Sequence, residues 1–66
     1  MKVQVNGEFK ELPDGATVAR LIEALALGAT RVAVEVNKDL VVKKAWDAHV
    51  LKDGDRVEVV TFVGGG

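Results

Sequence analysis

The chain has 66 residues, 48% of them hydrophobic, and it contains no cysteine. A chain of this length forms one domain with a small core, and without cysteine it has no disulfide, thiolate nucleophile or thiolate metal site. Nine basic and ten acidic residues give a net charge of -1, so nothing indicates binding to nucleic acid or to an anionic membrane. No apolar signal region and no span long enough to cross a bilayer is present. We expect a single-domain cytoplasmic protein with no nucleic-acid or membrane partner.

The N-terminal residues predict a β-hairpin. Apolar and polar side chains alternate in residues 2–5, which is the pattern of a half-buried strand. Asn6 and Gly7 follow, and both accept the positive φ of a type I′ turn. We expect residues 8–12 to return as a second strand and residues 13–15, Pro-Asp-Gly, to turn the chain out of the hairpin.

An amphipathic helix is predicted after this hairpin. Four apolar residues fall on one face, at the spacing i, i+3, i+4 and i+7: Val18, Leu21, Ile22 and Leu25. Thr17 precedes them and is expected to be the N-cap. Gly28 is expected to end the helix in the left-handed conformation, as the C′ residue.

Three more strands are predicted in the rest of the chain, at residues 31–36, 40–42 and 56–63. Residues 37–39 and 52–55 are rich in turn formers and separate these strands from what precedes them. Residues 43–48 have no strand pattern, and we expect a helical turn there around Trp46, whose ring fills an edge of the core.

The last predicted strand is apolar on both faces. Val57 and Val59 lie on one face, and Val60 and Phe62 lie on the other, a pattern typical of a central strand. With the final strand placed beside the first and the helix as a crossover, the elements predict a two-layer α+β fold. This is the β-grasp arrangement, a mixed sheet of four to five strands packed on one α-helix.

The two faces of the last strand lead to different expectations. We assign the helix to the face of Val57 and Val59. Val60 and Phe62 are then either exposed beside the C-terminus, where with Val63 they form a partner-binding surface, or covered by residues 40–51.

The chain ends on Gly64-Gly65-Gly66, which we interpret as a flexible tail on a domain of residues 1–63. Glycine has no Cβ, so the tail can enter a channel too narrow for other residues. Residues 63–66 reach ~13 Å when extended, enough to bring the Gly66 carboxylate into a partner's active site. On the tail alone, a frayed terminus or an expression scar is an equally good interpretation.

Five features together resemble one known family over essentially the full length: Asn6-Gly7, Val32-Ala-Val-Glu-Val-Asn37, Trp46, Leu51-Lys-Asp-Gly-Asp-Arg56 and Val63-Gly-Gly-Gly66. The chain resembles the ThiS family of sulfur carrier proteins in thiamine biosynthesis, which have a ubiquitin-like β-grasp fold. The turn of residues 51–56 before a valine-rich strand and a free glycine end is the specific part of this resemblance.

The resemblance implies a role in sulfur transfer. A ThiF-type adenylyltransferase would use ATP and Mg to convert the Gly66 carboxylate into an acyl-adenylate. Sulfur from cysteine, delivered through a cysteine desulfurase, would replace AMP and leave a thiocarboxylate, which thiazole synthase would consume. The chain would then be a protein co-substrate rather than an enzyme, with no catalytic side chain, bound metal or bound cofactor of its own.

Other classes of function stay open at this point. The small subunit of molybdopterin synthase is a similar sulfur carrier that ends in Gly-Gly, although it is generally longer. A non-catalytic β-grasp binding module with incidental glycines would leave Gly66 unmodified by ATP and an adenylating enzyme. A protein modifier would instead form isopeptide-linked adducts with lysines.

Overall fold

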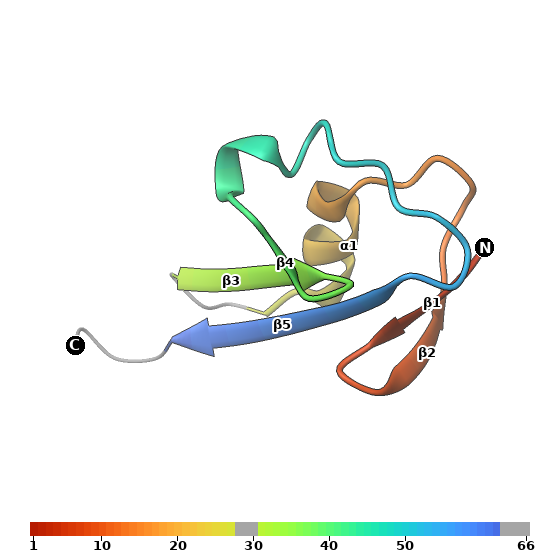
Figure 1. Ribbon diagram of the computed structural model, residues 1–66, viewed down its shortest axis with the longest axis horizontal. Helices are drawn as coiled ribbons and strands as arrows, with labels where there is room; N and C mark the ends of the chain where they lie inside the picture. Colours follow the sequence, from red (N-terminus) through yellow and green to blue (C-terminus); the bar gives the residue numbers. More distant parts are fainter. Residues whose placement is uncertain (28–30, 63–66) are drawn as a thin grey trace.

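A five-stranded mixed sheet carries one α-helix against one face in the computed structural model, which describes residues 1–27 and 31–62 (Figure 1). Within these residues the strand order is β2-β1-β5-β3-β4. The elements are β1 (Lys2–Val5), β2 (Glu8–Glu11), α1 (Val18–Leu25), β3 (Arg31–Val36), β4 (Asp39–Val41), the 3-10 helix η1 (Lys43–Ala45) and β5 (Arg56–Phe62). The expected α+β β-grasp fold is confirmed. No helix in the described ranges is long and apolar enough to cross a membrane.

The first hairpin forms as the sequence predicts. Asn6 and Gly7 have φ angles of 50° and 84°, the left-handed values that a type I′ turn requires at both positions. β1 and β2 pair antiparallel, and the ladder continues one residue further, because the Leu12 N–H donates to the Met1 carbonyl at 2.8 Å. All four residues of β2 are exposed, as expected for an edge strand.

Helix α1 begins where it was predicted and ends earlier. The Thr17 hydroxyl accepts a hydrogen bond from the Arg20 N–H at 3.3 Å, so the predicted N-cap is confirmed. The expectation that Gly28 closes the helix is wrong, because Ala26 takes the left-handed conformation at φ 49°. The apolar stripe is complete at Leu25, and the following residues are exposed, so a further turn would add little burial. Gly28 itself lies outside the described residues.

The second hairpin is offset by one residue from the prediction. Asn37 and Lys38 both have positive φ, at 52° and 72°, so they form a two-residue turn. Asp39 was predicted in that turn and instead pairs with Val36 in β4. A two-residue turn with positive φ at both positions matches the twist of the flanking strands, which explains why the strand begins at Asp39. It ends at Val41, because Val42 is the N-cap of η1.

Strand β5 is the centre of the sheet, as predicted. It pairs parallel with β1, where Val57 is the partner of Val5, and antiparallel with β3, where Val59 is the partner of Val34. The core consists of small apolar side chains from the sheet, the helix and the final loop: Val3, Val5, Val18, Leu21, Val34, Val36, Val41, Leu51, Val57 and Val59. The expectation that the helix covers Val57 and Val59 is therefore confirmed.

The connection from β4 to β5 runs along the side of α1 (Figure 1). The predicted helical turn is present as η1, and the indole N–H of Trp46 donates to the Val41 carbonyl at 2.9 Å. Trp46 is partly buried and packs against the core, which confirms its predicted place at the core edge. The connection then contacts the start of the helix, where the Val18 N–H donates to the His49 carbonyl at 3.0 Å.

The Asn6 side chain should contribute measurably to stability. Its amide accepts from the Val59 N–H at 2.8 Å and donates to the Val59 carbonyl at 3.1 Å. We expect Asn6→Gly to lower the free energy of unfolding by about 1–3 kcal/mol, because glycine keeps the positive φ but leaves both Val59 groups without this partner. Urea denaturation measures the change.

Lys38→Gly is the matched control, because Lys38 also has positive φ and makes no side-chain hydrogen bond within the described residues. This variant should leave stability unchanged or raise it. Equal losses in the two variants would contradict a role for the Asn6 amide.

Candidate docking surface at the end of the last strand

Val60 and Phe62 lie on the face of the sheet opposite α1. Their side chains are 53% and 52% exposed. The segment of residues 40–51 does not cover them, because after Val42 it follows the helix side, where the Leu51 N–H donates to the Ala16 carbonyl at 2.9 Å. Of the two alternatives that the sequence left open, the exposed position is confirmed and the covered one is wrong.

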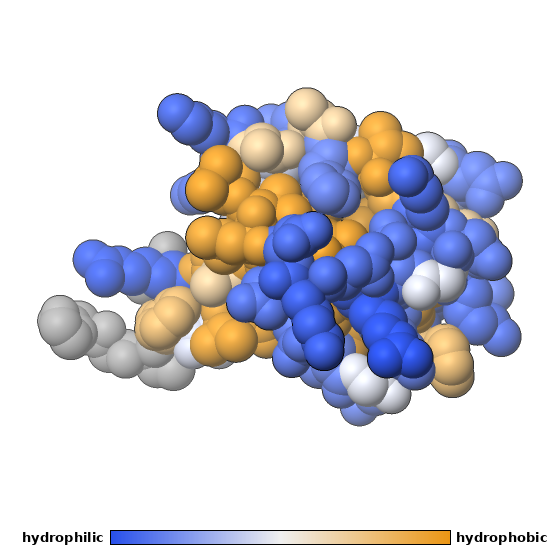
Figure 2. Space-filling model, viewed as in Figure 1, coloured by the Kyte–Doolittle hydropathy of each residue, from blue (hydrophilic) through white to orange (hydrophobic). Residues whose placement is uncertain are grey.

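These two residues belong to a larger apolar surface. In the register of the sheet, Val60 lies opposite Ala33, and the next strand places Leu40 opposite Glu35. Leu40 is 64% exposed and Val42 is 50% exposed. Figure 2 shows apolar side chains over β3, β4 and the end of β5. We call Leu40, Val42, Val60 and Phe62 the apolar patch.

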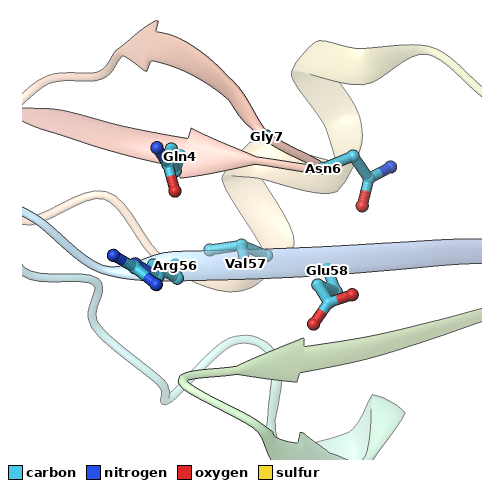
Figure 3. A pocket seen from close by; sticks show the side chains of 6 residues that line it. All are labelled: Gln4, Asn6, Gly7, Arg56, Val57 and Glu58. Carbon is cyan, nitrogen blue, oxygen red and sulfur yellow. The ribbon is translucent and has the colours of Figure 1, made fainter.

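Apart from Phe9 of β2, which lies opposite Gln4 and is 67% exposed, the rest of the open face is polar. Arg56 and Glu58 extend from the N-terminal half of β5 beside Gln4 of β1, where they border a shallow hollow of about 340 Å³ (Figure 3). Glu58 lies opposite Glu35, and Arg31 lies opposite Phe62. An apolar centre with charged residues at its border is the usual composition of a transient protein interface.

The predicted site residues fall into two groups. Val60 and Phe62 are brought together on one exposed face, beside the point where the described chain ends. Val63 and residues 64–66, including the Gly66 carboxylate, lie outside the described residues, so their predicted roles stay predictions.

Sequence reasoning missed the part of the patch that β4 supplies. A signal was present, because Leu40 and Val42 flank Val41, and alternation places both on the face opposite Val41. Val41 is buried and packs in the core, so its two neighbours point to the open face. Recognising this required knowing which face of β4 the helix covers.

The fold and the exposed surface together define a β-grasp protein that presents one face of its last strand. A family model described as the ThiS family matches residues 3–66, and the chain belongs to the ThiS family. The crystal structure of the thiamine biosynthesis protein (ThiS) from Geobacter metallireducens is 36% identical and superimposes with a TM-score of 0.84, covering all of both chains.

Two curated relatives extend the comparison. The sulfur carrier protein ThiS of Bacillus subtilis is 37% identical over 65 residues, which is 97% of this chain and 98% of that protein. A thiazole synthase of Paramagnetospirillum magneticum is 38% identical over all 66 residues, which make up 20% of that protein. The chain thus spans about a fifth of the length of this thiazole synthase.

Phe62 should contribute little to folding. Because about half of its side chain is exposed, we expect Phe62→Ala to change the free energy of unfolding by less than ~1 kcal/mol. Leu21→Ala is the comparison, since Leu21 is 1% exposed and its truncation should cost ~2–5 kcal/mol. Urea denaturation of both variants checks this. A loss at Phe62 as large as the loss at Leu21 would place Phe62 in the core.

Proposed function

We propose that this chain is a sulfur carrier protein of thiamine biosynthesis and that its Gly66 carboxylate carries the sulfur. The observation that supports this most directly is the match to the ThiS family, which extends from residue 3 to the C-terminal residue. The similarity to the sulfur carrier of Bacillus subtilis over nearly the whole of both proteins points the same way.

The chemistry follows from the weakness of a carboxylate as an acylating agent. In the proposed reaction, an oxygen of the Gly66 carboxylate attacks the α-phosphorus of ATP, and pyrophosphate leaves. The acyl-adenylate then reacts with hydrosulfide or an equivalent sulfur donor at its carbonyl carbon, and AMP leaves. This division of one difficult substitution into two easier ones is the usual advantage of a covalent intermediate.

The catalytic groups in this scheme belong to the partner proteins. A ThiF-type adenylyltransferase holds ATP and Mg, and a cysteine desulfurase supplies the sulfur. This chain is the protein co-substrate, and with no cysteine in its sequence it has no thiol that could capture its own adenylate. Its contribution is to present Gly66 and a surface that the partners recognise.

Thiazole synthase is the proposed acceptor of the sulfur. The support is the Paramagnetospirillum magneticum protein of that name, in which a region similar to the whole of this chain makes up a fifth of the polypeptide. When one organism joins two proteins in a single polypeptide, the corresponding separate proteins of another organism are good candidates for binding partners.

The proposed modification can be detected in the intact protein. With a ThiF-type enzyme, Mg-ATP and sulfide, we expect the mass to rise by the exchange of one oxygen for one sulfur, and fragmentation should place the change on Gly66. The measurement is intact-protein mass spectrometry followed by fragmentation.

Three variants control this experiment. A C-terminal extension removes the free carboxylate and should abolish the mass change. Deletion of Gly65 and Gly66 should do the same with an unchanged melting temperature, because the core residues all precede them. Gly65→Val should suppress the change, since a β-branched side chain restricts the backbone. A mass change that survives the extension, or that maps to a lysine, would contradict the proposal.

The apolar patch is the proposed docking surface for the adenylating enzyme. Truncating an aromatic anchor of an interface typically costs ~2 kcal/mol, so we expect Phe62→Ala to weaken binding by about thirtyfold. Phe9→Ala is the matched control: Phe9 is 67% exposed on the same face of the sheet, but it lies on edge strand β2 opposite Gln4, which pairs with Arg56 at the other end of β5 from Phe62. Isothermal titration calorimetry should show a loss for Phe62 alone, and equal affinities of the two variants would exclude Phe62 from the interface.

A further inference from the structure

Strand β5 continues beyond the end of its neighbour β1. The pairing of β1 with β5 ends where Val5 meets Val57, whereas β3 accompanies β5 as far as Phe62. Figure 1 shows β5 extending past the first hairpin with β3 alone beside it, and Figure 3 shows the Asn6 side chain where β1 ends. Among the residues that the structure describes, the second half of β5 therefore has no strand partner at the edge on the side of β1.

The hydrogen bonds of β5 identify which backbone groups face this edge. The Asn37 N–H donates to the Arg56 carbonyl at 2.7 Å on the β3 side, and the Asn6 N–H donates to the Val57 carbonyl at 2.9 Å on the β1 side. Because backbone groups alternate along a strand, Val59 and Thr61 also point toward the β1 side. The Asn6 amide binds both backbone groups of Val59.

Thr61 is the next residue on the same edge. Within residues 1–27 and 31–62, neither its N–H nor its carbonyl has a hydrogen-bond partner on the β1 side, because β1 and the Asn6 amide both end before it. An unpaired strand edge is a template for pairing with a further strand.

A hollow of about 290 Å³ adjoins this edge on the helix side. Four apolar residues line it together with four polar or charged ones: Val5, Leu25, Leu27 and Val59, with Asn6, Thr61, Glu8 and Lys10. Leu27 is 39% exposed. Glu8 and Lys10 have opposite charges, so the hollow has no net charge that would attract a charged side chain. Its apolar residues therefore favour a neutral apolar one.

We propose that an extended segment of thiazole synthase binds here, pairing with the backbone of Thr61 and placing an apolar side chain in the hollow. When a strand is added at a sheet edge, backbone hydrogen bonds give affinity and pockets for alternate side chains give specificity. The choice of occupant rests on the proposed function and on the thiazole synthase of Paramagnetospirillum magneticum, which contains a region similar to this whole chain. A strand bound at Thr61 fixes the direction of β5 just before the tail, and so directs Gly66 toward the acceptor enzyme.

Amide hydrogen exchange measured by NMR on the full chain tests the pairing. In the free protein, the Thr61 amide should exchange quickly, and the amides of Val60 and Phe62, which face β3, should exchange more slowly. Purified thiazole synthase should slow exchange at Thr61 by about tenfold or more. Unchanged exchange at Thr61 in the complex, or the absence of any complex, would overturn the proposal.

Leu27→Glu tests the hollow. This variant places a charge in the apolar part and should weaken binding to thiazole synthase by about tenfold or more, a change of ~1.4 kcal/mol. Its melting temperature and its ATP-dependent pyrophosphate release with the adenylating enzyme should stay unchanged, because Leu27 is already partly exposed and lies away from the apolar patch. Val50→Glu is the matched control, since Val50 is an exposed valine beside the start of the helix.

The outcomes separate this proposal from the proposed function. Equal affinity of Leu27→Glu and the unaltered chain for thiazole synthase would overturn the binding of a segment in the hollow, even when Gly66 is converted to a thiocarboxylate. Failure of the thiocarboxylate to form would overturn the proposed function, and that experiment contains no thiazole synthase and does not depend on the edge at Thr61.

Discussion

The alternation of side chains along β5 is the constraint on which the rest of the structure depends. Val57 and Val59 face the helix and are almost completely buried, whereas Val60 and Phe62 are half exposed on the other face. Because the side-chain period of a strand is two, a slip of one residue would exchange these sets and put the core valines in water. The register of β5 thus fixes the core and the apolar patch together.

Two asparagines hold this register from opposite sides. Asn6 binds both backbone groups of Val59, and the Asn37 side-chain oxygen accepts from the Arg56 N–H at 3.0 Å. Each asparagine is the first residue of a hairpin turn and has positive φ, a conformation that asparagine tolerates better than most residues. The same side chain that permits the turn therefore also locks the central strand, which links local turn chemistry to the position of the apolar patch.

Much of this architecture could be predicted from the sequence, because strong local signals and the tertiary contacts agree. Asn6 and Gly7 specify their turn alone, and the helical stripe specifies its buried face. The errors lie where tertiary contacts decide. Ala26 ends the helix although Gly28 is the better left-handed residue, because the apolar stripe stops at Leu25. Leu40 contributes to the patch because of which face of β4 is buried. A strand of three residues has too short an alternation of apolar and polar residues for its buried face to be predicted from the sequence.

The alternation of β5 also separates two surfaces within four residues. Val60 and Phe62 belong to the open face, whereas Val59 and Thr61 border the hollow on the helix side. Under the proposed function, the adenylating enzyme and thiazole synthase both need the one carboxylate at Gly66, so they act in turn and never together. A carrier gains nothing from very tight binding at either surface, since slow dissociation from one enzyme would delay the next reaction. The apolar patch has only four half-exposed residues, and the valines of the hollow are largely buried, so both surfaces are small, as suits transient contacts. Two distinct surfaces would allow each enzyme to be recognised by different residues although both take the same tail.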